Sequence, residues 1–192
     1  KHRGESTPVA LEIKVGMVET AYLLLPGEGT VNYLVREKSG ALAPARITFV
    51  ALDEDGKAQR WEGRNRVEMG ESRFDQGIKH QVHTHTGKGT TKLPAGRYNV
   101  YISRGFEYSV DLHENFEVQA GQTVTLDGLL IHEMDTSGYI SGDFHLHAQP
   151  SIDSSLPLRM RVAANAAEGL EFVTSTDHDT VTNYAPYIND MG

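Results

Sequence analysis

Short apolar segments separated by turn residues fill the first two thirds of the chain. Between residues 9 and 36, apolar and polar residues alternate or cluster in strand fashion, which predicts two or three strands. Segment 46–52 is followed by Asp55-Gly56, a hairpin signal because glycine accepts positive φ. Residues 57–92 are polar, glycine-rich and weakly periodic, so a long irregular connection is expected there.

Three further strand-like segments follow at 97–103, 108–118 and 123–132, with turn residues between them. Short strands at this spacing, without a strong helix, indicate an antiparallel β-sandwich. We therefore expect residues 1–134 to form a sandwich domain.

The pattern changes in residues 135–192. An apolar run at 139–147 is typical of a strand, and apolar residues then recur every four positions across 158–170, as in an amphipathic helix. A second strand-like segment, 171–176, begins almost at once. Strand, helix and strand make a βαβ unit with parallel strands and a right-handed crossover. A second domain, of the α/β kind, is expected here.

Composition excludes several classes of function. The chain has 192 residues and no cysteine, so disulfides and thiolate metal sites are excluded. Its 26 acidic residues exceed its 18 basic ones, for a net charge of -8, which argues against a nucleic-acid partner or an anionic membrane surface. No apolar run approaches the length of a membrane span. The ends at Lys1 and Gly192 suggest a processed or cut fragment.

Two histidines in the 139–147 strand are the strongest candidates for chemistry. His145 and His147 are two positions apart, so a strand places both side chains on one face about 6.6 Å apart. Asp153 follows in the next loop, and His178 follows the second strand. We expect these four side chains to bind a divalent cation. The alternative is a pair of buried histidines that bond to backbone carbonyls.

Asp177 and Asp179 flank His178 and leave two interpretations open. Asp177 could orient a ligating imidazole through its second nitrogen, which is the usual role of an outer carboxylate. Either residue, Asp179 especially, could instead cap a helix N-terminus.

The same His-x-His spacing occurs at His83 and His85, with His80 nearby. These residues lie in the polar connection without a neighbouring acid. We favour surface histidines over a metal site there, because spacing alone does not establish geometry.

The segments GDFHLH, PSIDSS, EGLEF and TSTDHD together resemble the opening of a polymerase-and-histidinol-phosphatase (PHP) domain, most closely the CehA/McbA branch of metal-dependent hydrolases. The preceding LPAGRYNVYISRGFEYS and AGQTVTLDGLLIH resemble a carboxypeptidase-regulatory-like sandwich. The resemblance implies a seven-stranded α/β barrel with two or three divalent ions, commonly zinc, manganese or iron. It assigns His145, His147, Asp153 and His178 as metal ligands.

The resemblance implies that the chain is the N-terminal part of a divalent-metal hydrolase, a phosphoesterase acting through metal-bound hydroxide. The alternatives are a carbamate or ester hydrolase of the same fold, and a non-catalytic sandwich binding module with a degenerate PHP-like portion. A small phosphate or carbamate ester would be the substrate.

Because the family's later ligands are missing, we expect this chain alone to be inactive. Its open sheet edge should be covered by the remaining barrel or by another chain. The missing cysteines, the absent initiator methionine and the sandwich favour an exported bacterial protein.

Overall fold

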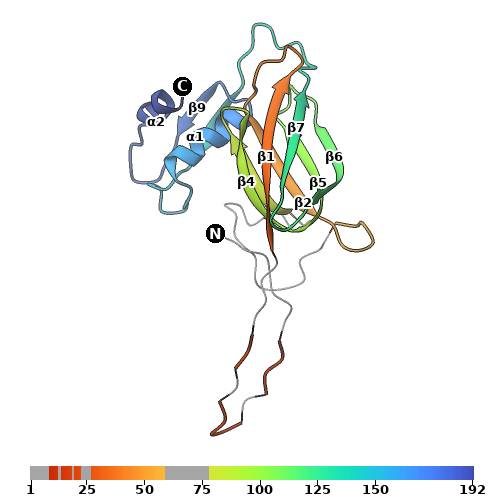
Figure 1. Cartoon of the computed structure of the whole chain (residues 1–192). Coiled ribbons are helices and arrows are strands. Elements are labelled where there is room, and N and C mark those ends of the chain that lie inside the picture. Colours follow the sequence, from red (N-terminus) through yellow and green to blue (C-terminus); the bar gives the residue numbers. More distant parts are fainter. Residues whose placement is uncertain (1–8, 13, 19, 23–26, 59–77) are drawn as a thin grey trace.

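The computed structural model of the chain describes residues 9–12, 14–18, 20–22, 27–58 and 78–192. Most of the regular elements are β-strands, and two short helices lie near the C-terminal end. In Figure 1 the helices and the last strand, β9 (Phe172–Ser175), lie beside a larger body made of strands alone. Neither described helix has the length and apolar character needed to cross a membrane.

The larger body is a sandwich of two sheets. Its strands are β1 (Glu28–Glu37), β2 (Ala45–Ala51), β3 (Ile78–Thr84), β4 (Lys88–Pro94), β5 (Gly96–Ser103), β6 (Asp111–Val118) and β7 (Thr123–Leu130). One sheet has the order β4-β1-β7, and the other has the order β3-β2-β5-β6. β1 and β7 pair in parallel, whereas the other neighbours in these sheets pair antiparallel. The prediction of a purely antiparallel sandwich is therefore wrong.

Strict alternation along the strands produces the core of the sandwich. In β2, ARITFVA, every second residue is buried, so Ile47 and Phe49 point inward. They belong to one cluster with Val31 of β1 and Leu126 of β7, which come from the opposite sheet. Side chains of this size contribute about 1.5–3 kcal/mol each when they are fully buried. One continuous core therefore holds the two sheets together.

Two strands lie where an irregular connection was predicted. β3 falls within 57–92 and β4 begins there and ends at Pro94; each is an edge strand, paired with β2 and β1 respectively. The strand signal of KHQVHTHTGKG is weak because histidine, glutamine and threonine occupy most of its positions in place of aliphatic residues. Residues 59–77 of the predicted connection lie outside the described residues.

The N-terminal prediction is also partly wrong. Two or three strands were expected across 9–36, but the described residues of that range contain one, β1. The described residues between 9 and 22 carry no strand assignment.

The C-terminal unit, residues 142–192, contains β8 (Gly142–Leu146), α1 (Leu158–Ala167), β9 and α2 (Ala185–Met191). β8 and β9 pair in parallel as a separate two-stranded sheet. A small core of Leu146, Ala148 and Tyr184 lies between this sheet and the helices, with Leu158 and Val162 of α1 packed against it.

The predicted opening of a PHP-type α/β barrel is wrong. The described residues are mostly β-sheet with two short helices, and the only parallel strands outside the sandwich are β8 and β9. A strand–helix–strand order is compatible with many folds, because βαβ units occur in open sheets as well as in barrels. The local order was therefore a poor guide to the architecture. The domain boundary between residues 134 and 135 stays a prediction.

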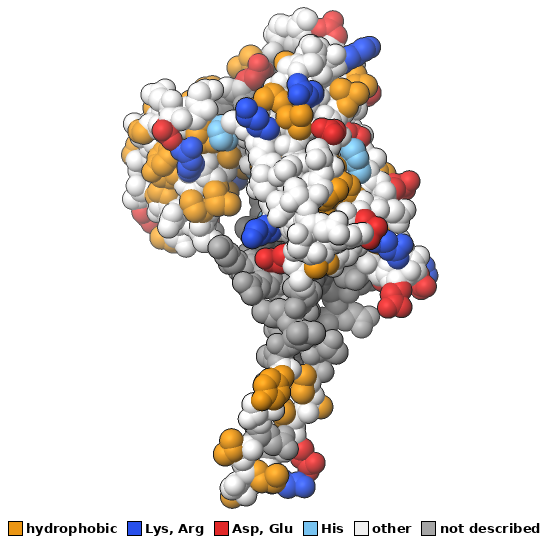
Figure 2. Space-filling model, in the orientation of Figure 1, with side chains coloured by type: hydrophobic (Ala, Val, Ile, Leu, Met, Phe, Trp, Pro, Cys, Tyr) orange, Lys and Arg blue, Asp and Glu red, His pale blue; other side chains and the backbone are white. Residues whose placement is uncertain are grey.

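The C-terminal unit has an exposed apolar surface. Phe144 and Phe172, with ring centroids 5.6 Å apart, are 70% and 46% exposed. Figure 2 shows apolar side chains spread over the C-terminal unit. The expectation that further polypeptide covers this unit stays a prediction.

Candidate metal centre

The candidate residues lie beyond the C-terminal ends of two parallel strands. His147 directly follows β8, and His178 comes three positions after the end of β9. Because β8 and β9 run in parallel, their C-terminal ends meet at the same edge of the sheet. The loop after β8 carries Asp153 to this edge as well.

His147, Asp153 and His178 converge at this edge, with one potential ligand atom from each side chain within 4.8 Å of the others. Nδ1 of His147 lies 2.9 Å from both carboxylate oxygens of Asp153. Nε2 of His178 lies 3.3 Å from Oδ2 of the same carboxylate. The two imidazole rings meet nearly edge to face, with centroids 4.8 Å apart.

Short hydrogen bonds hold the two loops against each other. The buried hydroxyl of Ser151 donates to Oδ1 of Asp153 at 2.6 Å and accepts the His178 backbone N–H at 3.0 Å. The His147 carbonyl accepts a hydrogen bond of 2.9 Å from Nε of Arg161 on α1. The sequence-based analysis missed both Ser151 and Arg161, although Ser151 stands in the PSIDSS segment that provided Asp153.

The Asp153 carboxylate is strongly biased towards its ionised form. The hydrogen bond from Ser151 and then that from His147 lower its pKa to about 2, and the nearby His147 and His178 imidazoles act in the same direction. Asp153 is therefore an anion throughout the pH range in which neutral imidazoles can bind a metal.

His145 lies beside this group but outside it. Its ring centroid is 5.1 Å from that of His147, as their shared strand face predicts, yet the group of converging ligand atoms does not include it. The His145 backbone N–H donates to Asp143 at 2.9 Å, and the side chain is exposed. Its role as a ligand stays a prediction.

Asp177 holds the backbone together at this edge. One of its oxygens accepts the buried Ala148 N–H at 2.6 Å, and the other accepts hydrogen bonds from the hydroxyls of Ser175 (3.0 Å) and Thr182. Burial raises the pKa of Asp177, but these hydrogen bonds, led by that from Thr182, outweigh burial and lower it overall. These contacts indicate a structural carboxylate, while its predicted role in orienting an imidazole stays a prediction.

Asp179 occupies the left-handed region of backbone conformation, with φ +55°. It does not cap α2, whose N-cap residue is Tyr184.

The donor set of the three-residue group fits a divalent transition metal. Two imidazoles and one carboxylate, without thiolate, suit zinc and also manganese or ferrous iron. Bonds of about 2.0–2.2 Å require ligand atoms closer together than the 4.8 Å limit of the group, a difference that small side-chain rotations supply. The side chains of Asp153 and His178 are 47% and 55% exposed, so an ion would remain open to solvent on one side.

The site lies on an open surface. An open depression of about 690 Å³ lies elsewhere, where the linker to the C-terminal unit passes Glu107 and Tyr108, and it does not include the three ligands. Catalytic and small-molecule sites are usually concave and shielded from water.

The histidines of β3 do not form a comparable group. His80 turns towards the core, where it stacks on Phe49 and bonds to Thr91 at 2.8 Å. His83 is partly buried, and burial together with the charges of Arg46 and Arg161 lowers its pKa to about 4. The interpretation of His80 and His83 as surface histidines is therefore wrong, because β3 packs on both faces.

Comparisons with known proteins identify no family for the chain. No family model matches it. No curated protein matches it.

Three solved structures are similar to part of the chain at low identity and low TM-score. The Bacillus anthracis TIE protein is 15% identical over 64% of this chain and 21% of its own, with a TM-score of 0.33. The 3-chlorocatechol 1,2-dioxygenase of Rhodococcus opacus 1CP is 12% identical over 56% of this chain and 60% of its own, with a TM-score of 0.37. The minor pilin GBS52 of Streptococcus agalactiae is 17% identical over 67% of this chain and 60% of its own, with a TM-score of 0.36. The chain thus spans about a fifth of the first protein and three fifths of the others.

The resemblance to PHP hydrolases is wrong. It predicted the start of an α/β barrel, whereas the described residues form a sandwich with a two-stranded parallel sheet beside it, and no family model matches the chain. The motif segments are short, and a pair of histidines on a strand with nearby acids can arise in unrelated folds. The phosphoesterase function that rested on this resemblance is withdrawn with it.

Proposed function

We propose that this chain is a non-catalytic binding module, a β-sandwich whose C-terminal unit holds one divalent cation on His147, Asp153 and His178. The observation that carries the proposal is the convergence of three ligand atoms within 4.8 Å from two strand ends and one loop. Zinc suits this donor set best, with manganese and ferrous iron as the other candidates.

The contacts of Asp153 support a cation-binding site over a cluster whose only role is to stabilise the fold. The Asp153 carboxylate lies 2.9 Å from Nδ1 of His147 and 3.3 Å from Nε2 of His178, so one carboxylate and two imidazoles already face the same point. Ser151 holds this carboxylate and the His178 backbone in place, so the ligands are ordered before any ion binds. Preorganised ligands bind more tightly because less conformational entropy is lost on binding.

The open surface around the group supports binding rather than catalysis. Two of the three ligand side chains are about half exposed, and the depression at the linker lies away from them. We expect the purified 192-residue chain to show no hydrolysis of phosphate or carbamate esters above a metal-only blank.

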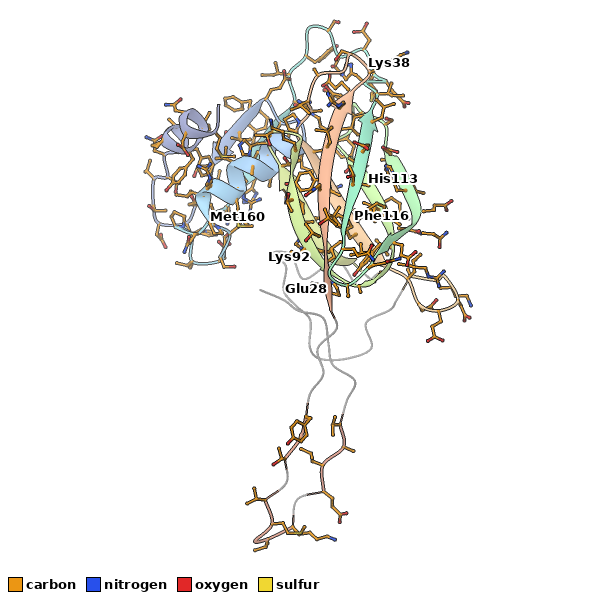
Figure 3. The ribbon with its side chains drawn as sticks, in the orientation of Figure 1. Glu28, Lys38, Lys92, His113, Phe116 and Met160 are labelled. Carbon is orange, nitrogen blue, oxygen red and sulfur yellow. The ribbon has the colours of Figure 1, made fainter. Side chains whose placement is uncertain are left out.

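The test is a calorimetric titration of the metal-free chain with Zn²⁺ at pH 7. The expected result is one ion per chain, with binding abolished in His147→Ala and strongly weakened in Asp153→Asn. His113→Ala is the matched control, because His113 also pairs with an aspartate, Asp111, at 3.1 Å, but on the far edge strand β6. Figure 3 shows His113 well away from α1 and the C-terminal unit.

Equal binding by the parent chain and His147→Ala would contradict the proposal. An absence of Zn²⁺ binding by the parent chain would contradict it as well. Loss of binding in His113→Ala would place the ion elsewhere and overturn the assignment.

A further inference from the structure

An ion pair and a close backbone approach are among the contacts that hold the C-terminal end of α1 against the sandwich. Glu168, just after the helix, forms an ion pair of 2.6 Å with Arg46 of β2. The Gly105 backbone, in the turn between β5 and β6, packs so closely that a Cβ atom there would overlap the Glu168 carbonyl oxygen. Gly105 also has φ +59°, a conformation that favours glycine. The sandwich therefore determines where this end of α1 lies.

Arg161, in the same helix, contacts the candidate metal centre. Its Nε–H donates to the His147 carbonyl at 2.9 Å. Its charge also acts on His83 of β3, together with that of Arg46. α1 thus contacts the sandwich and the ligand-bearing loop at once, and Figure 3 shows the helix with its labelled Met160 beside the sandwich.

Within the C-terminal unit, hydrogen bonds from Ser151 and from Ser154, whose hydroxyl donates to the His147 carbonyl at 3.3 Å, also hold the loop after β8, but the apolar support of this loop is small. The sheet of this unit has two strands, and its buried apolar core consists of Leu146, Ala148 and Tyr184. A two-stranded sheet with a small core is only marginally stable by itself. The position of α1 on the sandwich therefore acts together with these local hydrogen bonds to determine where the His147 backbone lies.

We propose that the sandwich is a structural part of the metal centre: it fixes α1 through Arg46 and Gly105, and α1 fixes His147 through Arg161. Arg161 is a positioning residue that acts through the His147 carbonyl. This proposal rests on the proposed function and adds to it that the sandwich determines the affinity for the ion. Replacing a residue that hydrogen-bonds to a metal ligand typically lowers metal affinity by about 10–100-fold.

The first test weakens the contact between α1 and the sandwich at a position distant from the three metal ligands. Gly105→Ala should weaken Zn²⁺ binding by about tenfold, because the new methyl group displaces Glu168 and with it α1. Gly121→Ala is the matched control: Gly121 also has positive φ, +73°, but nothing lies within 4 Å of a Cβ there, so its affinity should be unchanged. Equal affinities in the two variants would overturn the proposal.

The second test separates the hydrogen bond from helix packing. Glutamine carries an N–H donor at the same number of bonds from the backbone as Nε of arginine, whereas methionine carries none. Arg161→Met should lose about tenfold in Zn²⁺ affinity, and Arg161→Gln should retain most of it. The absorption spectrum of bound Co²⁺, which reports coordination geometry, should change in Arg161→Met alone.

The outcomes distinguish the two proposals. If the parent chain binds no Zn²⁺, the proposed function fails. If the parent chain binds it and Arg161→Met binds it with the same affinity and Co²⁺ spectrum, the positioning role alone fails. Equal losses in Arg161→Met and Arg161→Gln would also refute the positioning role, since they would trace the effect to charge or packing. Near-ultraviolet circular dichroism of each variant establishes that the sandwich is folded before titration.

Discussion

Replacing Asp177 by alanine should destabilise the C-terminal unit more than any other single change near the candidate metal centre. The substitution removes the acceptor of the buried Ala148 N–H and of two hydroxyl groups. Ala148 is fully buried, so its N–H would be left without its partner at a cost of about 1–3 kcal/mol. The lost hydroxyl bonds add about 0.5–1.5 kcal/mol each, less whatever those hydroxyls regain from water. We expect a total loss of about 3 kcal/mol.

Urea unfolding of the metal-free chain, followed by far-ultraviolet circular dichroism, measures this loss. For slopes of about 1–3 kcal/mol per M, the midpoint of the C-terminal unit should fall by at least about 1 M. The control is Asp179→Asn, two positions away, where the side chain is exposed and asparagine tolerates the φ of +55°. The control should change stability by less than about 0.5 kcal/mol.

The pH dependence of the free energy of unfolding gives an independent measure of the hydrogen bonds of Asp177. The pKa of Asp177 is lowered in the folded chain, so the ionised carboxylate stabilises the fold above its unfolded value of about 3.9. That stability is lost as the pH falls through the folded pKa, and the alanine variant should lack this part of the acid transition. If the Asp177→Ala midpoint moves no further than that of Asp179→Asn, the structural role assigned to Asp177 is wrong.

Two further predictions concern the sandwich. The pKa of His83, followed by NMR of its imidazole, should lie near 4. Because this pKa is lowered from about 6.5, the free energy of unfolding should decrease as the pH falls from about 6.5 to 4. A measured pKa of 6 or above would contradict the burial of this side chain. Gly128→Val should cost about 2 kcal/mol in urea unfolding, because even a Cβ there would lie 2.5 Å from Cδ1 of Ile102 in the opposite sheet. Thr125→Val, on the exposed face of the same strand, is its control, and equal effects of the two valines would refute the close approach of the sheets.

Much of the local structure could be read from the sequence where polar and apolar residues contrast strongly. The alternation in segment 46–52 predicted β2, and a strand, a helix and a strand were expected across 139–176. The spacing of His145 and His147 placed both imidazoles on one strand face, and their ring centroids are 5.1 Å apart. These features depend on the backbone geometry of one segment, which residue spacing determines directly.

The candidate metal centre was only partly predictable. Asp153 and His178 were expected beside His147, and parallel pairing of β8 and β9 does bring them together. Asp177 was singled out as an outer carboxylate, but its hydrogen bond to the buried Ala148 N–H and the contact from Arg161 were not predicted, since burial and the packing of α1 arise from residues distant in the chain.

The spacing of apolar and polar residues, and the order of strands and helices that it predicts, were determined by the sequence itself. The pairing of the strands and the packing of the sheets were decided by the tertiary structure. Edge strands β3 and β4 carry few apolar residues, so their places in the sheets follow from pairing with β2 and β1 and not from a local apolar pattern. The parallel pairing of β1 with β7 joins segments about 90 residues apart, and no local pattern specifies such a partner. The βαβ order at the C-terminal end is common to barrels and open sheets alike. Only packing against the sandwich decided that β8 and β9 form a two-stranded sheet beside it, because strand pairing and helix docking depend on contacts between distant segments.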